Sequence, residues 1–210
     1  MVGASSQAKL LVIACGALSH EIVWLQKVNG WTQIDLQCLD AELHNEPKLI
    51  PQKLRAALEK NRGQYQRIFI GYGDCGTGGE IDRIIAEESD AGHKKIDRLP
   101  GAHCYSFYAG EGRFNDLAEQ ELGTFYLTDF LVENFDRLMV KGLKLDKYPQ
   151  LRDQYFANYR LVIYLSQRLD TELVATAKAA AEFLGLAFRH EHCGYGDLET
   201  GLQEQVLKFR

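Results

Sequence analysis

The sequence lacks the features that would mark a membrane or nucleic-acid-binding protein. Its longest run of apolar or small residues, Leu10 to Leu18, is far shorter than the ~20 residues of a transmembrane helix. No run of Lys and Arg exceeds two residues, and acidic side chains outnumber basic ones by 29 to 24, a formal charge of −5. We therefore expect no binding to nucleic acid through phosphate neutralisation and no polybasic membrane anchor.

Targeting and disulfide signals are also missing. The segment Met1–Gln7 has no charged region ahead of an apolar stretch, so we expect no signal peptide and a cytoplasmic protein. The five cysteines are odd in number and widely spread, so we expect no disulfide bonds in a cytoplasmic protein. A chain of 210 residues also buries enough surface to fold without them. Because no Cys-x-x-Cys pair occurs, the zinc-ribbon, ferredoxin and thioredoxin-like motifs are excluded.

Strand and helix patterns alternate along most of the chain, which predicts an α/β fold with a doubly wound, mostly parallel, Rossmann-like sheet and helices on both faces. The strand patterns are Lys9–Cys15, Ile34–Cys38, Arg67–Gly71, Tyr159–Leu165 and Leu186–His192. The helical patterns between them are Ala17–Val28, Pro47–Asn61, Glu80–Glu88 and Thr171–Leu184. We predict a single α/β domain over residues 9–210, with a mainly helical insertion at about 113–158 that contains a short strand.

Cysteines recur where predicted strands end. Cys15, Cys75 and Cys193 each follow a strand and precede a glycine, and Cys104 follows a turn beside His103. The carboxyl ends of parallel strands meet at one edge of a sheet, where ligands bind. Thiolate and imidazole are the natural donors for zinc, and thiolates for iron, so a metal site is predicted.

The predicted metal ligands are Cys15, Cys75, His103 and Cys104. The alternative is that each cysteine is simply buried, since cysteine is among the most buried residue types. We assign Cys38, on an alternating strand, to the core.

Cys75 also fits a second hypothesis, a metal-free thiol enzyme. A thiol at the start of a helix has a lowered pKa, which would make Cys75 a nucleophile or methyl acceptor. His103 or His20 would then act as its base.

The residues from Gly71 to Gly76 spell G-x-G-x-x-G. We discount a dinucleotide site because this turn follows the third strand and Asp74 would repel a pyrophosphate. Backbone amides at the following helix start favour a smaller anion or cofactor. The candidate binding residues are Gly73, Gly76, Thr77 and Gly78.

Two weaker patterns lie in the second half of the chain. His190 and His192 share a face of their strand and are a candidate ligand pair, although exposed histidines are more often only solvated. The many aromatic residues between Phe114 and Tyr159 fit either a wall for a planar ligand or, more commonly, a core.

Three segments resemble motifs of a bacterial and archaeal family known as domain of unknown function 1638. They are Ile13–Leu18, Tyr72–Gly76 and Arg98–Tyr105. Members are often encoded near corrinoid-dependent methyltransferases, so the resemblance implies a role in one-carbon or corrinoid metabolism, with a corrinoid cofactor or a methyltransferase protein as partner.

The leading hypothesis is a cytoplasmic protein that binds a metal ion or a metal-containing cofactor at a Cys/His site on the carboxyl edge of its sheet. The alternatives are the metal-free thiol enzyme and a non-catalytic module that docks a partner protein.

Overall fold

A computed structural model describes residues 9–92 and 95–208. It confirms the α/β class with parallel sheets. The strands form two sheets where one was expected, and the chain divides into two compact units. Unit 1 lies within residues 1–104 and 197–210, and unit 2 within 105–196. The segment considered above for a signal peptide falls outside the described residues.

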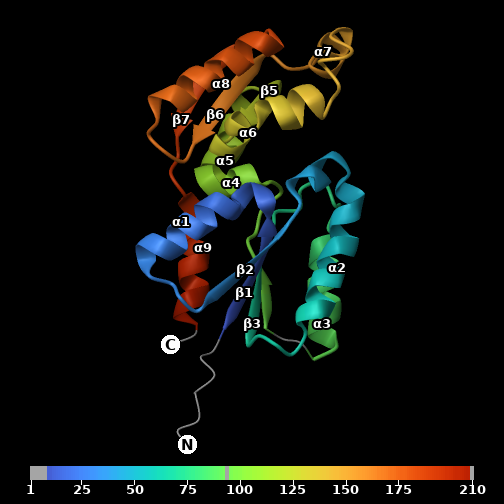
Figure 1. Cartoon of the computed structure of the whole chain (residues 1–210), viewed down its shortest axis with the longest axis vertical. Helices are drawn as coiled ribbons and strands as arrows, with labels where there is room; N and C mark the ends of the chain where they lie inside the picture. The colour runs from blue at the N-terminus through green and yellow to red at the C-terminus, as the bar shows by residue number, and fades with distance from the viewer. Residues whose placement is uncertain (1–8, 93–94, 209–210) are drawn as a thin grey trace, which may run out of the picture. The chain divides into compact units, whose positions relative to one another are not determined.

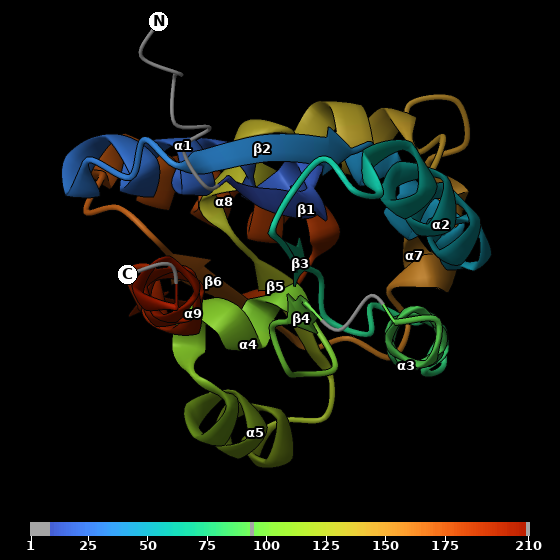
Figure 2. The same ribbon diagram turned by 90° about the horizontal axis from the view of Figure 1, so that it is seen from below.

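Unit 1 holds a four-stranded parallel sheet in the order β2-β1-β3-β4. Its strands are β1 (Leu10–Cys15), β2 (Ile34–Leu39), β3 (Arg67–Gly71) and β4 (Ile96–Arg98). Its helices are α1 (Ser19–Asn29), α2 (Ile50–Asn61), α3 (Glu80–Asp90) and α9 (Gly196–Leu207), with the short 3-10 helices η1 (Gly16–Leu18), η2 (Ala41–Asn45) and η3 (Pro47–Leu49). Helices α1 and α9 lie on one side of this sheet and α2 and α3 on the other (Figures 1 and 2).

The sequence explains most of these elements. All six residues of β1 are buried, because it lies between β2 and β3 and is covered on both faces. Helix α1 ends at Gly30, whose left-handed φ of 63° lets the chain turn away. Strand β4 was not predicted, since it has only three residues, one of them buried.

Unit 2 holds a three-stranded parallel sheet in the order β5-β6-β7. Its strands are β5 (Thr124–Leu127), β6 (Leu161–Ser166) and β7 (Ala187–His192). Its helices are α5 (Glu111–Gln120), α6 (Asp129–Glu133), the π-helix η4 (Asp136–Lys141), α7 (Gln150–Tyr155) and α8 (Thr171–Leu184), while α4 (Cys104–Ala109) begins on the last residue of unit 1. The segment predicted as a helical insertion thus supplies β5 to this sheet.

The central strand β6 separates two cores. Val162 and Tyr164 pack with residues of α8 and α6, whereas the alternate residues Ile163 and Leu165 pack with those of α5. The aromatic side chains of this unit mostly pack on one another, for example Phe125 on Phe156 with ring centroids 5.4 Å apart. The core interpretation of the aromatic residues is therefore favoured over a wall for a planar ligand.

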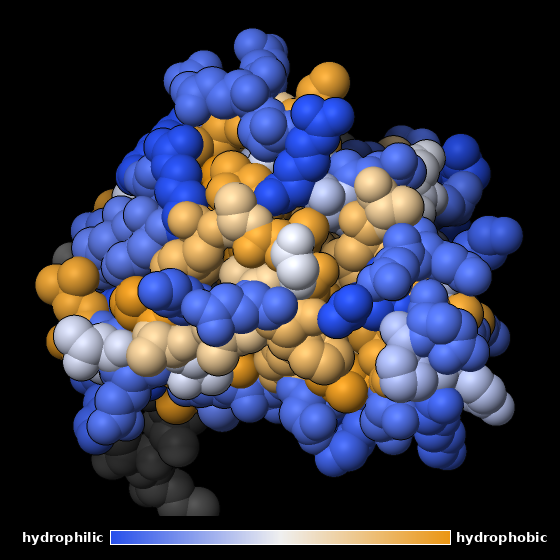
Figure 3. Space-filling view, turned by 90° about the horizontal axis from the view of Figure 1, so that it is seen from above, coloured by the Kyte–Doolittle hydropathy of each residue, from blue (hydrophilic) through white to orange (hydrophobic). Residues whose placement is uncertain are grey.

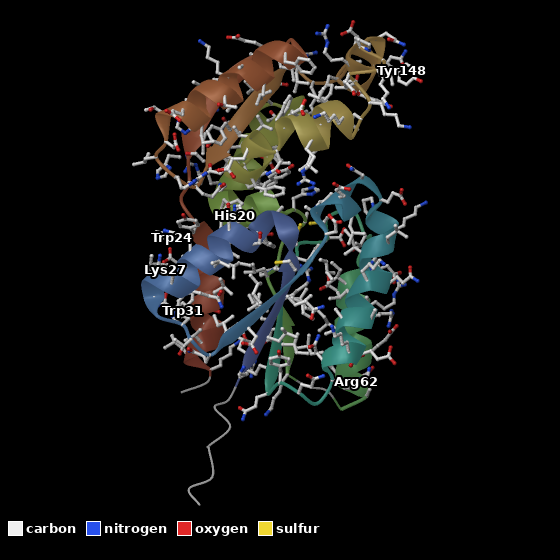
Figure 4. The ribbon with its side chains drawn as sticks, in the orientation of Figure 1. His20, Trp24, Lys27, Trp31, Arg62 and Tyr148 are labelled. Carbon is white, nitrogen blue, oxygen red and sulfur yellow. The ribbon has the colours of Figure 1, made fainter. Side chains whose placement is uncertain are left out.

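Some apolar side chains of unit 2 remain at the surface. Figure 3 shows a face on which apolar side chains gather between hydrophilic ones. Tyr148, labelled in Figure 4, is 49% exposed and thus departs from the core pattern.

The chain enters and leaves unit 2 at neighbouring points. A Cβ atom at Gly196 would clash with the carbonyl oxygens of Phe107 and Tyr108, so only glycine fits this close approach. Among the described residues, no helix is both long enough and apolar enough to cross a membrane.

Candidate metal centre

Four parallel strands of unit 1 bring sulfur and imidazole groups to one edge of the sheet. Cys15 ends β1, His44 lies on η2 directly after β2, Cys75 follows β3, and Cys104 follows β4. Sulfur atoms are visible beside the carboxyl end of β1 in Figure 4. Because the strand order reverses around β1, this edge is where an open α/β sheet binds its ligand.

Three of these groups are close enough to share one ion. Ligand atoms of His44, Cys75 and Cys104 all lie within 4.8 Å of one another, and the two Sγ atoms are 3.3 Å apart. Two thiolates bound to zinc at ~2.3 Å with a tetrahedral angle lie about 3.8 Å apart. The sulfurs therefore need to separate by only about half an ångström to hold an ion between them.

Backbone hydrogen bonds between two loops bring Cys75 beside Cys104. The amides of Asp74 and Cys75 donate to the carbonyl oxygens of Gly101 and Ala102, at 2.9 and 2.8 Å. Cys75 adopts a left-handed φ of 50°, which is unusual for a residue other than glycine and is typical of constrained functional loops. The loop that follows β3 is thus fixed against the loop that follows β4.

Gly73 makes this close approach feasible. A Cβ atom there would lie 3.0 Å from the carbonyl carbon and 3.1 Å from the backbone nitrogen of His103. These are backbone atoms, which cannot turn aside as a flexible side chain would. Gly73 therefore has a structural role in the site, whichever ligand the site takes.

His44 is held by its own 3-10 helix. The Asp40 side chain caps η2 by accepting the amide of Glu42 at 2.9 Å, and His44 Nδ1 lies 3.2 Å from the carbonyl oxygen of Ala41. A carbonyl only accepts, so Nδ1 carries the proton in this bond and Nε2 has the lone pair for a metal. A backbone carbonyl on the second ring nitrogen is the usual partner of a metal-bound histidine.

The titration of His44 reflects its sulfur neighbours. Burial lowers its pKa, but hydrogen bonds to Cys15 and Cys75 outweigh this and raise the pKa from 6.5 to about 10. The neighbouring sulfur groups thus favour a positive charge at this place. A metal ion bound here would supply that positive charge in place of the proton on the imidazole.

The pKa of Cys75 is raised, opposite to the lowered pKa expected for a helix-start nucleophile. The hydrogen bond with Cys104 is the main cause and burial the second. Helix α3 begins only at Glu80, so its positive end does not act directly on the sulfur. A bound cation would instead lower the pKa of Cys75, because a coordinated thiol is deprotonated.

Cys15 borders the group without joining it. Its Sγ lies 3.6 Å from His44 Nδ1 and accepts the amide of Ala17 at 3.3 Å. Its sulfur is not one of the atoms that lie mutually within 4.8 Å. Among the described residues, three protein donors therefore lie close enough to bind one ion, and Cys15 lies beside one of them, His44.

A buried hydroxyl adjoins the same cluster. Tyr72 has no exposed surface, and among the described residues its hydroxyl has no hydrogen-bond partner. Its ring stacks on His44 at an interplanar angle of 12°, and burial and the nearby Cys15 raise its pKa. Cys15 is thus the candidate partner for this buried hydroxyl.

The predicted residues fare differently in this arrangement. Cys75 and Cys104 come together, whereas His103 is not a member of the group and His44 was missed. The chemical signal for His44 was its place directly after a strand, the same position that singled out the cysteines. Cys38, expected in the core, is exposed, and Cys193 belongs to unit 2.

The glycine turn is already occupied by a side chain of its own. The carboxylate of Asp74 accepts the amides of Gly78 and Gly79 and the Thr77 hydroxyl, at 3.1, 2.6 and 2.8 Å. These bonds outweigh burial and lower the pKa of Asp74. An anion at Gly73, Gly76, Thr77 and Gly78 would have to displace this carboxylate, so that binding site stays a prediction.

Comparison with known proteins gives one match. The family model described as "Protein of unknown function (DUF1638)" matches residues 38–202, which is most of the chain. The chain belongs to this family. His44, Cys75 and Cys104 lie inside the matched region, whereas Cys15 and the segment Ile13–Leu18 lie outside it. No curated protein and no solved structure matches the chain.

Proposed function

We propose that this member of the DUF1638 family is a metal-binding protein whose His44, Cys75 and Cys104 hold one divalent ion. The observation that carries the proposal is the convergence of one imidazole and two thiols within 4.8 Å, from loops that follow three different strands. Two thiolates balance the charge of a divalent cation, which makes a partly buried ion feasible between the exposed His44, the buried Cys75 and the half-buried Cys104. Two sulfur donors and one nitrogen donor favour zinc over magnesium or calcium.

Three protein donors leave a fourth coordination position for another ligand. Structural zinc sites are usually closed by four protein ligands, and catalytic ones keep a position for water or substrate. We infer an open centre, with Cys15 as the competing candidate for the fourth position.

The test is elemental analysis of protein purified anaerobically without an affinity tag. We expect about one zinc per chain, lost in Cys75→Ser, Cys104→Ser and His44→Gln. The matched controls are Cys193→Ser, in unit 2, and His103→Gln, which removes the ligand that sequence reasoning favoured. A metal content well below one per chain, unchanged by the three substitutions, would contradict the proposal.

Substitution by Co²⁺ reads out the ligand set. Thiolate ligands give Co²⁺ an intense charge-transfer absorption, which should weaken in each cysteine variant and persist in Cys193→Ser. A spectrum altered equally by Cys15→Ser would assign Cys15 as the fourth ligand and show a closed centre.

The metal-free thiol enzyme remains the second hypothesis. It requires Cys75 to alkylate quickly at neutral pH, whereas the raised pKa of this thiol predicts slow alkylation. Corrinoid chemistry and a methyltransferase partner rest on the family resemblance alone and stay predictions.

A further inference from the structure

A second cluster of donor atoms lies in unit 2, at the carboxyl edge of its sheet. Strands β6 and β7 are parallel, and their register places Tyr164 beside His190 and Ser166 beside His192. Because residues two apart on a strand share a face, these four side chains emerge on the same side. The Ser166 hydroxyl lies 2.8 Å from His190 Nε2 and 3.1 Å from His192 Nδ1.

The hydroxyl at the middle of this cluster is buried, while both histidines are exposed. Burial makes Ser166 a poor nucleophile for any substrate, which argues against a Ser-His catalytic pair. A hydroxyl carries one proton and can donate to only one imidazole, so the other imidazole must donate to it. One nitrogen of each ring thus lies within hydrogen-bond distance of the same hydroxyl oxygen, and both rings reach the surface of the unit.

The His190 ring packs against a buried tyrosine on the neighbouring strand. It stacks on Tyr164 with centroids 5.2 Å apart and an interplanar angle of 21°. The Tyr164 hydroxyl donates to Asp129 at 2.6 Å, and this carboxylate, only 1% exposed, also accepts the amides of Gln167 and Arg168. A network of this kind fixes the orientation of a ligand side chain before any ion binds.

We infer that Ser166, His190 and His192 form a second metal site, which takes a divalent transition-metal ion of the class that prefers imidazole, such as Ni²⁺ or Zn²⁺. Ligands at right angles on bonds of ~2.1 Å lie about 3.0 Å apart, which is the range of the two distances measured from Ser166. The exposed side of the imidazoles leaves the remaining positions to water. This site contains no thiolate and does not depend on the centre in unit 1.

The experiment is a calorimetric titration with Ni²⁺ of the full chain carrying Cys75→Ser and Cys104→Ser, without an affinity tag. We expect one Ni²⁺ per chain. His190→Gln and His192→Gln, each added to this background, should weaken binding at least tenfold. His20→Gln is the matched control, because His20 is an exposed histidine on α1 (Figure 4), and this change should leave binding unaltered.

The outcomes separate the two sites. Absence of Ni²⁺ binding in the Cys75→Ser, Cys104→Ser chain would overturn the second site and leave the thiolate centre untouched. Binding that persists in both His190→Gln and His192→Gln would also overturn it. Circular dichroism of each variant verifies folding, and because both histidines are exposed we expect unchanged spectra.

Discussion

The close approach at Gly73 gives a quantitative test of how the metal centre is built. In Gly73→Ala the new methyl group would meet two backbone atoms of His103 at 3.0 and 3.1 Å and the carbonyl oxygen of Gly101 at 3.2 Å. Ordinary contacts begin at about 3.4 Å, so the loop after β4 must retreat by a few tenths of an ångström. Overpacking of this kind costs about 1–3 kcal/mol.

The same displacement acts on the donor atoms. The hydrogen bonds from Asp74 and Cys75 to this loop set the 3.3 Å separation of the two sulfurs, so their loss should weaken zinc binding about tenfold or more. Urea unfolding measures the stability of the chain, and competition with a chromophoric chelator measures its zinc affinity.

Gly112→Ala is the matched control. Gly112 lies in the first turn of α5 with nothing within 4 Å of its added Cβ, so alanine should stabilise the chain by less than about 1 kcal/mol and leave zinc affinity unchanged. If Gly73→Ala matched the wild type in both stability and affinity, the loop contact would have no part in forming the site.

Three further outcomes follow from the structure. Asp129→Ala should lower the free energy of unfolding by about 3–5 kcal/mol, because it leaves buried donors unpaired. The control Asp136→Ala removes an exposed ion pair and should change the free energy of unfolding by less than about 0.5 kcal/mol. Equal effects of the two changes in urea unfolding would refute the role of the buried network. Burial raises the pKa of Asp97, but its partners Arg67 on β3 and Lys208, which follows α9, outweigh this and lower it. Its stabilising contribution therefore holds above its unfolded pKa near 3.9 and is lost as the pH falls through the folded value. Asp97→Asn should therefore flatten the stability curve below about pH 4, and an unchanged acid limb would contradict this. Hydrogen peroxide should convert the Cys75 and Cys104 thiols to a disulfide, with release of two water molecules, and bound zinc should slow the reaction. Mass spectrometry that finds no disulfide between Cys75 and Cys104 would count against their proximity.

Much of unit 1 could be predicted from the sequence, because its strands are short apolar runs bounded by glycine or polar residues. Leu10–Cys15 and Arg67–Gly71 are found almost as expected. Which strands pair is not encoded in their periodicity, and this is why a single sheet was expected where β5, β6 and β7 form a second one. A three-residue strand such as β4 leaves no periodic signal at all.

For the candidate site, the sequence predicted that cysteines gather at this edge of the sheet. The structure places Cys75 beside Cys104 there, with His44 rather than His103 as the neighbouring imidazole. Proximity along the chain favoured His103 because it precedes Cys104. Proximity in space favours His44, which is 60 residues away but follows the strand next to β1. A donor on a 3-10 helix carries no motif, so only its position after a strand could have indicated it.

The route of the chain has a consequence for the order in which the molecule folds. Helix α9 completes unit 1 only after the chain has passed through unit 2, so closing that excursion of about 90 residues costs roughly 4 kcal/mol of chain entropy if unit 2 is unfolded. Once unit 2 is folded, the close approach of Gly196 to Tyr108 holds together the points where the chain enters and leaves unit 2. The loop is then already closed, and α9 can dock without this loss of chain entropy. We therefore expect that folding of unit 2 brings α9 close to the rest of unit 1. Destabilising unit 2 should then slow the final folding step of unit 1, which holds the metal centre.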